Sequence, residues 1–311
     1  LDSVYPPDEL DKERKVIVEE INMVEDTPED ICYDEIATAT YGDTGLGKTI
    51  LGPVENVLSF KKADVDKFVS EYYSPKNTVI TFSGNITESG ADALVKKYVL
   101  PRYKAAYPDV TDAKDEFNLR VYRERIKDFE QSNIALAFPS ISFGDEAFTV
   151  QAALNVILGG GMSSRLFQSV REQKGLAYSV FSSPSGYKNT GTFNVYLNIS
   201  KQNTEKTLEA VKAELDALKK NGITDEELER TKVQLKSALV FASESVQSIM
   251  SSCGKQLLLT GKPYDVDARI AAIDAVTKDQ VNDFAVRCFD YSKMCAAYVG
   301  KAINVDLLEI F

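Results

Sequence analysis

The chain contains no histidine among its 311 residues, and it has only four cysteines. Without histidine it cannot build a Ser-His-Asp or Cys-His catalytic site, or a histidine-ligated metal site, from its own residues. The cysteines are Cys32, Cys253, Cys288 and Cys295, and no two of them have C-x-x-C spacing. We therefore expect free thiols in a reducing compartment.

Excess positive charge and long apolar runs are also lacking. The net charge of −11 argues against nucleic acid and anionic membranes as partners, and mildly favours neutral or cationic ones. No apolar run approaches the ~18 residues of a membrane span. Hydrophobic residues make up 44% and charged residues 27%, as in soluble globular proteins. The chain begins with Leu1 and has no signal-like segment, so we expect a cut or processed protein.

One stretch, YGDTGLGKTILGP, contains the G-x-x-x-x-G-K-[ST] pattern of a phosphate-binding loop, from Gly42 to Thr49. Such a loop comes after a buried strand and opens a helix. Here the preceding residues, EDICYDEIATAT, have the pattern of an amphipathic helix, and Gly52 and Pro53 stand where the new helix would have to begin. We therefore expect a glycine-rich loop that ends one helix, and no bound nucleotide.

Two parts of the sequence resemble each other when the residue numbers of the second part are lowered by 216. We expect this offset to hold without a gap along the whole of the repeat. Matching pairs are Val65 and Val281, Phe68 and Phe284, Tyr73 and Phe289, Phe82 and Tyr298, and Gly84 and Gly300. Further upstream, Glu13-Arg14 matches Glu229-Arg230. A register of this length, with the same order of predicted helices and strands, indicates an internal duplication.

The second copy begins with a long segment that the first copy lacks. It contains predicted strands at 132–141, 177–185 and 191–199, and predicted helices at 146–158 and 204–221. The duplication therefore predicts that roughly ninety residues of the first copy are missing before Leu1. A full copy would have the order β-α-α-β-β-α-α-α-α-β.

This order predicts an α+β fold of duplicated domains, each an antiparallel sheet with helices packed on one face. We expect residues 1–105 to be the remnant of the first domain, 106–120 a linker, and 121–311 the second domain.

Two glutamates share one face of the helix predicted in DELDKERKVIVEEINMVEDTPED. Glu13 and Glu20 are two turns apart, and Glu19 points elsewhere. At the offset of 216, Glu13 is matched by Glu229 but Glu20 by Lys236, which suggests a specific role in the first copy. A solvated acidic face is the alternative. The apolar stripe that we expect this helix to bury consists of Val16, Ile17, Ile21 and Val24.

Two segments resemble the insulinase/pitrilysin-like zinc metallopeptidases, and specifically their bacterial processing-peptidase-like branch. ERKVIVEEINMVEDTPEDICYDEI is similar to the segment that holds the third zinc ligand, and GGGMSSRLFQSVREQKGLAYSVFSS to a signature of the second domain. The resemblance covers essentially the whole chain and implies duplicated α+β domains. In the family, an H-x-x-E-H helix of the first domain supplies two zinc-binding histidines and the general base. That helix is absent here, so the resemblance implies an inactive fragment that does not hold zinc tightly.

Residue by residue, the resemblance makes Glu20 the third zinc ligand and Glu13 a catalytic residue that orients or tunes the site. Arg171 and Tyr178 match a pair that contacts the peptide substrate near the scissile bond. Arginine can clamp a carbonyl, and tyrosine can donate to a developing oxyanion. Without the resemblance, they would be a surface arginine and a buried strand tyrosine. Gly159-Gly160-Gly161 is predicted to be a flexible turn.

Two functions fit these observations. The first is a fragment of a zinc metalloendopeptidase that hydrolyses peptides, in the bacterial cytoplasm. The alternative is a non-catalytic peptide-binding partner subunit of the same fold. The presence of both Glu13 and Glu20 favours the first. An incomplete first domain would expose apolar helix faces, so we expect a homodimer or pairing with the missing N-terminal segment.

Nucleotides should give no thermal shift, because the strand–loop–helix context of a phosphate-binding loop is missing. Differential scanning fluorimetry with ATP and GTP, each with Mg²⁺, measures this. Lys48→Ala should respond in the same way as the unchanged chain. A stabilisation that is lost in Lys48→Ala would contradict the interpretation.

Overall fold

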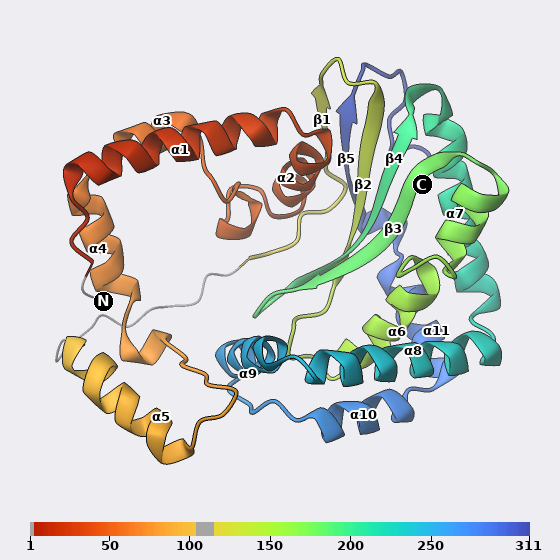
Figure 1. Ribbon diagram of the computed structural model, residues 1–311. Coiled ribbons are helices and arrows are strands. Elements are labelled where there is room, and N and C mark those ends of the chain that lie inside the picture. Colours follow the sequence, from red (N-terminus) through yellow and green to blue (C-terminus); the bar gives the residue numbers. More distant parts are fainter. Residues whose placement is uncertain (1–2, 104–114) are drawn as a thin grey trace. The chain divides into compact units, whose positions relative to one another are not determined.

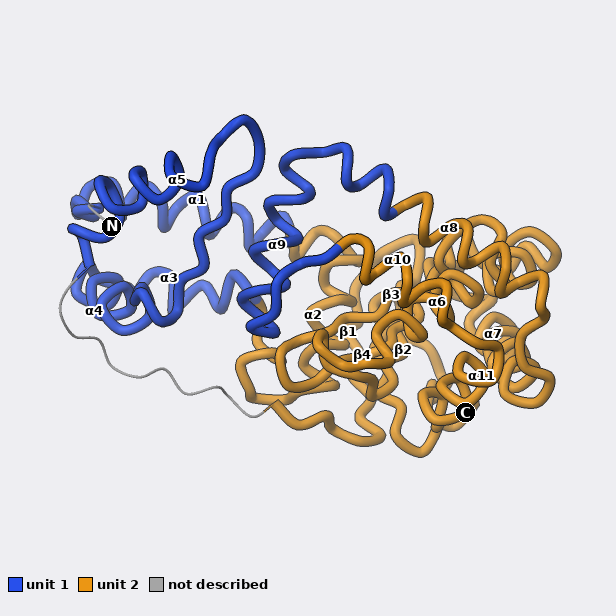
Figure 2. Tube along the Cα trace, turned by 90° about the horizontal axis from the view of Figure 1, so that it is seen from below, with its two compact units in different colours: residues 1–23, 50–113, 239–265 blue, residues 24–49, 114–238, 266–311 orange. Residues whose placement is uncertain are grey.

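The computed structural model, drawn in Figure 1, describes residues 3–103 and 115–311. The chain forms two compact units, coloured in Figure 2. Unit 1 is drawn from Leu1–Met23, Ile50–Ala113 and Leu239–Asp265, and unit 2 from Val24–Thr49, Lys114–Ala238 and Val266–Phe311.

These units do not follow the order of the chain. A segment of the predicted first domain, Val24–Thr49, packs in unit 2, and a segment of the predicted second domain, Leu239–Asp265, packs in unit 1. Most of the predicted linker, 106–120, lies outside the described residues. The boundaries 1–105 and 121–311 stay a prediction about the duplication.

Unit 2 is built on one mixed sheet with the strand order β1-β5-β2-β4-β3 (Figure 1). Its strands are β1 (Tyr122–Ile126), β2 (Gln131–Ser140), β3 (Ala177–Gly186), β4 (Gly191–Ser200) and β5 (Cys295–Gly300). β2 is antiparallel to β4 and β5, and β3 is antiparallel to β4, whereas β1 runs parallel to β5. The last strand of the chain therefore lies inside the sheet, with a partner on each edge.

The larger core lies between one face of this sheet and the helices α6 (Phe148–Leu158), α7 (Thr204–Asn221) and α11 (Lys278–Cys288). α7 illustrates the sequence pattern behind this packing. Its residues Leu208, Val211, Leu215 and Leu218 recur at helical spacing and are buried. Gly222, with φ of +68°, comes directly after the helix and allows the chain to turn.

The opposite face of the sheet is covered by α2 (Pro28–Tyr41). The second core contains Ile31, Cys32, Ile36, Ala39, Ala135, Ala137, Cys295, Ala297 and Val299. Its sheet residues are mostly small, which lets the helix lie close to the strands. The α+β class is thus as predicted, but helices cover both faces, and the second face is covered by a helix from the predicted first domain.

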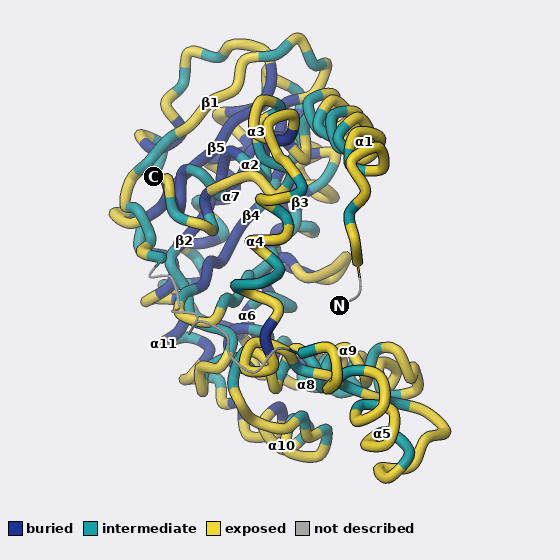
Figure 3. Tube along the Cα trace, turned by 90° about the vertical axis from the view of Figure 1, so that its left-hand side faces the viewer, coloured by how far each residue is buried: buried dark blue, intermediate teal, exposed yellow. Residues whose placement is uncertain are grey.

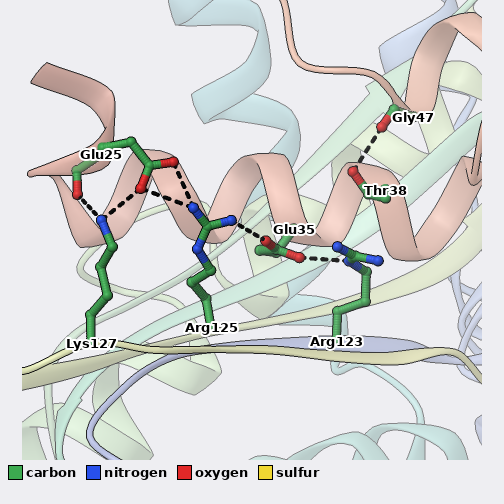
Figure 4. A network of polar contacts seen from close by, with 7 residues as sticks. All are labelled: Glu25, Glu35, Thr38, Gly47, Arg123, Arg125 and Lys127. Carbon is green, nitrogen blue, oxygen red and sulfur yellow. Dashed lines mark hydrogen bonds and ion pairs between the residues drawn. The ribbon is translucent and has the colours of Figure 1, made fainter. Parts of the chain in front are cut away.

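A row of ion pairs joins α2 and the end of α1 (Pro7–Glu25) to the edge strand β1 (Figure 4). Glu35 is buried and accepts hydrogen bonds from Arg123 (Nε–Oε2, 2.5 Å) and Arg125 (Nη1–Oε1, 3.4 Å). Arg125 also donates to Glu25 (Nη2–Oε1, 2.8 Å), as does Lys127 (Nζ–Oε2, 2.7 Å). The hydrogen bond from Lys127 is the main reason that the pKa of Glu25 lies below its ordinary value, although burial acts in the opposite direction. Alternation along the strand places these three basic side chains on one side.

The remaining helices contribute few residues to these two cores. They are α3 (Val54–Ser59), α4 (Lys62–Tyr72), α5 (Glu88–Leu94), α8 (Asp225–Ser243), α9 (Val246–Thr260) and α10 (Val266–Ala275). α1, α4, α5 and α9 contain no buried residue. None of the helices in the described part of the chain has the length and apolar character of a membrane span.

Backbone geometry explains why glycine stands at two positions of the loop after α2. Gly42 has φ of +58°, and a Cβ on Gly47 would lie 2.1 Å from the carbonyl oxygen of Gly42. Thr38 Oγ1 donates to the carbonyl oxygen of Gly47 at 2.8 Å. A helix precedes this loop, and the next α-helix starts only at Val54. The predicted glycine-rich loop at the end of a helix is confirmed.

The duplication is visible in the elements themselves. α4 and α11 have equal lengths, and their first residues, Lys62 and Lys278, keep the offset of 216, as do the short turns Pro75–Asn77 and Tyr291–Lys293. α1 and α8 also have equal lengths, but they begin at an offset of 218, and so do α2 and α9. The prediction of a constant offset is therefore wrong in the upstream part, where the two copies are displaced by two further positions.

The first copy has the exposed apolar helix face that an incomplete domain predicts, but the last strand that the duplication predicts for it is not formed among the described residues. The apolar stripe of α1 is not buried, and Val16 in particular is 50% exposed. Residues 79–84, the counterpart of β5, pair with no strand among the described residues. Both segments have the expected pattern, but the described part of unit 1 contains no sheet for them to join.

Glu35→Ala should lower the free energy of unfolding by about 1–3 kcal/mol, because it leaves the guanidinium groups of Arg123 and Arg125 without their buried partner. Urea unfolding followed by circular dichroism measures the loss. Glu130→Ala, an exposed change just before β2, should cost less than about 0.5 kcal/mol. Equal losses in the two variants would contradict a role for Glu35 in fixing α2.

Candidate functional site

The four predicted site residues lie in two pairs, one in each compact unit. Glu13 and Glu20 lie on α1 within unit 1. Arg171 lies in a π-helical turn, Phe167–Gln173, and Tyr178 lies in β3, both in unit 2. The structure brings the second pair together, whereas the first pair stays separated along one helix.

Glu13 and Glu20 are exposed, and neither carboxylate forms a hydrogen bond or ion pair with another described residue. α1 is continuous, so the two side chains share a face and are about 10 Å apart along the axis. They cannot ligate the same ion. The offset of 218 places Thr231 and Ala238 opposite them, rather than Glu229 and Lys236. Both carboxylates are therefore specific to the first copy.

The described residues do not form a zinc site by themselves. No group of three or more histidine, cysteine, aspartate or glutamate side chains could hold a metal ion in the described part of the chain. All of the cysteines are free thiols. Glu20 would supply a single carboxylate, which is too few ligands for the tetrahedral coordination of zinc.

Arg171 and Tyr178 form a polar pair at the surface. The guanidinium carbon of Arg171 lies 5.8 Å from the centre of the Tyr178 ring and 5.0 Å from that of Phe167. Contacts of this kind hold the arginine through its cation–π attraction. Arg171 is exposed and the Tyr178 side chain is 71% exposed, so the guanidinium and hydroxyl groups both face solvent. Together they offer hydrogen-bond donors to a carbonyl group.

The backbone explains why residues seven apart meet here. The amide of Gly175, with φ of +60°, donates to the carbonyl of Arg171 at 3.1 Å and ends the π-helical turn. β3 then starts with a register shift between Ala177 and Ser179, which leaves Tyr178 without a partner on β4. A β-bulge of this kind re-aims a side chain. Tyr178 is therefore exposed, unlike the buried tyrosine that an ordinary strand would have.

Two glycines of the run before this segment lie close to neighbouring backbone. The Ser182 amide on β3 donates to the carbonyl of Gly159 at 3.1 Å, and a Cβ on Gly159 would lie 2.4 Å from that amide nitrogen. A Cβ on Gly160 would lie 2.8 Å from the Cα of Val156. The predicted turn is present, and the absence of a Cβ lets it lie against β3 at Gly159 and against α6 at Gly160.

Arg165 anchors the same segment, although the sequence did not predict a role for it. Its guanidinium group donates to both carboxylate oxygens of Glu227 (2.7 Å each) and to the carbonyl of Gly222 (2.9 Å). Burial is the largest influence on the pKa of Glu227 and raises it, but hydrogen bonds from Arg165 and Thr224 outweigh burial and lower the pKa. Arg165 lies within the segment GGGMSSRLFQSVREQKGLAYSVFSS, and this is the one signal that could have identified it.

A groove of ≈ 170 Å³ lies between α2 and the β3–β4 hairpin. Its lining residues are Tyr33, Ile36, Ala37, Thr40, Tyr41, Ser185, Tyr187, Thr192, Asn194 and Tyr196. None of these side chains carries a formal charge at neutral pH. The rings of Tyr33 and Tyr196 meet edge to face, with centroids 4.7 Å apart. The groove suits an uncharged side chain, and the sequence did not predict it.

Comparison with known sequences gives one family and several relatives. A family model described as the peptidase M16 inactive domain matches residues 59–235. The chain is 38% identical over 292 residues to an uncharacterised zinc protease of Bacillus subtilis, covering 93% of this chain and 71% of that protein. It is 34% identical over 289 residues to an uncharacterised zinc protease of Streptomyces coelicolor, covering 91% and 63%. The chain thus spans less than three quarters of the length of each of these relatives.

Two solved structures resemble this structure closely. The crystal structure of a peptidase M16 inactive domain from Pseudomonas fluorescens has a TM-score of 0.88 at 21% identity, covering 98% of this chain and 73% of that one. A protease from Helicobacter pylori also has a TM-score of 0.88 at 21% identity, covering 96% and 73%. At this identity the likeness shows the fold alone, and it confirms the α+β class.

Glu227→Gln should destabilise the chain above about pH 5, by about 1–2 kcal/mol, and progressively less as the pH falls below 4.5. The folded pKa of Glu227 is lowered, so its contribution is complete above the ordinary value of 4.5. That contribution is lost as the pH falls through the lower folded value. Urea unfolding at several pH values measures the difference. Glu226→Gln, an exposed neighbour on α8, is the control, and a difference independent of pH would contradict the assignment.

Proposed function

The chain belongs to the peptidase M16 family, and we propose that it supplies the peptide-binding part of a zinc metallopeptidase. The observation that carries this proposal is the exposed pair of Arg171 and Tyr178, held by a π-helical turn and a β-bulge. The resemblance of this segment to the family predicted a substrate contact at these two positions. Their geometry supports that role, because both donors face solvent from a packed scaffold.

In this proposal, Arg171 donates hydrogen bonds to a carbonyl oxygen of the bound peptide and holds that peptide in place. The Tyr178 hydroxyl donates to the carbonyl oxygen on which negative charge develops when the peptide bond is attacked. The groove beside α2 would accept an uncharged side chain of the same peptide. β3 links the two features, because it begins beside Tyr178 and its residue Ser185 lines the groove.

Glu20 would supply one zinc ligand, and Glu13, two turns away, would orient or tune the metal site. The chain has no histidine, so the two zinc-binding histidines of the family, and the general base of the same H-x-x-E-H helix, would come from polypeptide outside this chain. We therefore propose that the chain alone binds peptides without cleaving them. The naming of its relatives as zinc proteases favours this role over that of a non-catalytic partner subunit. A bacterial cytoplasmic location stays a prediction.

Arg171→Ala should weaken peptide binding by about tenfold, because it removes a charge-assisted hydrogen bond. Tyr178→Phe should weaken it by a smaller factor of about two to five, since only one neutral donor is lost. Fluorescence anisotropy with a labelled, unstructured peptide of about ten residues without net negative charge measures both. Mass spectrometry of the same samples, with and without added Zn²⁺, should detect no cleavage product.

Arg287→Ala is the matched control, because Arg287 is an exposed arginine on α11 of the same unit whose guanidinium group stacks on Phe284. Its affinity for the peptide should equal that of the unchanged chain. Equal affinities for Arg171→Ala and Arg287→Ala would overturn the substrate-contact role. Cleavage by the chain alone would overturn the claim that its active site is incomplete.

A further inference from the structure

The groove beside α2 forms where two regular patterns meet. α2 contributes residues from Tyr33 to Tyr41 at the spacing i, i+3, i+4, i+7 and i+8, and residues with this spacing lie on one flank of a helix. β4 contributes every second residue from Thr192 to Tyr196, and such side chains point to one face of a sheet. β4 is itself buried along most of its length (Figure 3). The groove is therefore held by a packed strand and a continuous helix.

A pair of aromatic rings stands at each end of this flank of α2. Tyr33 meets Tyr196 edge to face with centroids 4.7 Å apart, and Tyr41 meets Tyr187 in the same way at 5.9 Å. Tyr33 and Tyr41 are eight positions apart, which is about 12 Å along a helix axis. A third ring placed midway would lie about 6 Å from each pair, within the range of about 4.5–7 Å at which rings attract each other.

The size of the groove matches one six-membered ring. Its volume is ≈ 170 Å³, and an engineered protein cavity of about 150 Å³ binds benzene. Ile36 and Ala37 also line the groove, and in the sequence of α2 they lie between the two tyrosines. They add apolar contacts for a ring at this place. A fused double ring, as in tryptophan, would need more room.

Asn194 adds a hydrogen-bond acceptor to these apolar contacts. Its Nδ2 donates to the carbonyl of Ser183 at 3.2 Å and to Thr192 Oγ1 at 2.9 Å. A carbonyl oxygen only accepts, so the amide nitrogen has to face Ser183, and this fixes the orientation of the amide. Asn194 is 5% exposed, and its Oδ1 accepts no hydrogen bond from the described residues. An unpaired buried acceptor costs free energy, so this oxygen favours a ligand with a donor.

Two phenol groups of the groove are also without partners. The hydroxyls of Tyr187 and Tyr196 line the groove and form no hydrogen bond with another described residue. Burial raises the pKa of both phenols above the ordinary value. Both therefore keep their protons at neutral pH, and each can donate one hydrogen bond and accept another. The groove thus combines aromatic walls with a few uncharged polar groups.

We propose that this groove takes one tyrosine side chain of the bound peptide, so that the chain selects tyrosine-containing peptides. The inference rests on the peptide binding proposed above and names the kind of peptide that is bound. The ring of the ligand lies between the two pairs of aromatic rings. Its hydroxyl donates to Asn194 Oδ1 and completes the hydrogen bonds of that amide.

Other uncharged side chains meet only part of these conditions. A leucine has the size of the groove, but it leaves Asn194 Oδ1 unpaired and forms no ring–ring contacts. A phenylalanine forms the ring contacts and still leaves that oxygen unpaired. Asparagine and glutamine supply a donor but have no ring. A charged side chain would lose water without gaining an opposite charge, because no lining residue is charged.

The first test uses the full 311-residue chain and three small probes, the N-acetyl amides of tyrosine, phenylalanine and leucine. Nuclear magnetic resonance should show that N-acetyl-L-tyrosinamide, at millimolar concentration, shifts the side-chain amide signals of Asn194 and the backbone amide signal of Tyr196. N-acetyl-L-phenylalaninamide should bind about threefold more weakly, because it lacks the donor. N-acetyl-L-leucinamide should bind about tenfold more weakly, because it also lacks the ring contacts. This comparison needs no variant of the protein.

Ala37→Leu fills the groove from α2 and should weaken the binding of N-acetyl-L-tyrosinamide by at least about tenfold. Ala213→Leu is the matched control. Ala213 is an exposed alanine on α7, a helix that packs on the opposite face of the sheet. Its substitution should leave the affinity unchanged. Circular dichroism verifies that both variants keep the helix content of the unchanged chain.

The second test asks whether the groove acts on peptides. Fluorescence anisotropy compares two labelled glycine–serine peptides of about ten residues, one with a single tyrosine and one with leucine in its place. The tyrosine peptide should bind about fivefold more tightly. In Ala37→Leu the two affinities should become equal, whereas Ala213→Leu should keep the difference.

Two results would overturn the proposal. One is that N-acetyl-L-tyrosinamide binds no better than N-acetyl-L-leucinamide. The other is that the tyrosine peptide binds no better than the leucine peptide, even if the groove takes the free amide. Arg171→Ala tests the proposed function separately. If it leaves the peptide affinity unchanged while the tyrosine preference persists, the contact assigned to Arg171 is wrong and the groove assignment stands.

Discussion

The constraint on which unit 2 depends is the position of β5. All six of its residues are buried, so both of its edges need partners and both of its faces need cover. Its edge partners are β1 and β2, and its faces lie under α2 and under the helices of the larger core. α2 comes from near the beginning of the chain and β5 from near its end. The sheet is therefore closed by segments that a division of the sequence into consecutive domains assigns to different domains.

The helices and strands with a strongly periodic sequence could be predicted. The elements against which they pack could not. The predicted helix at 204–221 coincides with α7, and the predicted strands at 177–185 and 191–199 match β3 and β4 to within a residue. β1 has no such signal, because three of the five residues of YRERI are charged, as on a solvated surface. The guanidinium groups of Arg123 and Arg125 find a buried carboxylate partner only when Glu35 of α2 lies over the strand. The apolar pattern of α2 gives no information about which sheet it covers, since any sheet face of small residues would accept it.

The candidate site likewise has some features that the sequence predicts and others that depend on tertiary packing. The resemblance identified Arg171 and Tyr178, but the reason that Tyr178 is exposed lies in a register shift, which depends on backbone pairing and has no signal in the side chains. The tight approach of Gly159 to β3 and the Arg165–Glu227 pair are likewise tertiary features. The spacing of Glu13 and Glu20 predicted a shared helix face correctly, because that face follows from helical geometry alone. Whether they serve a metal depends on groups that the described residues do not include.

The two pairs also differ in how firmly they are held, and this difference bears on chemistry. The segment of Arg171 is fixed by the fully buried Val170 and by the largely buried Arg165–Glu227 pair. Glu20 projects from a helix that has no buried residue. A metal ligand works only when it is held to within about 0.5 Å of its place by packing and supporting hydrogen bonds. α1 can meet that requirement only after its apolar stripe is covered. The peptide binding proposed for Arg171 and Tyr178 has no such precondition, because the scaffold that positions them is already closed.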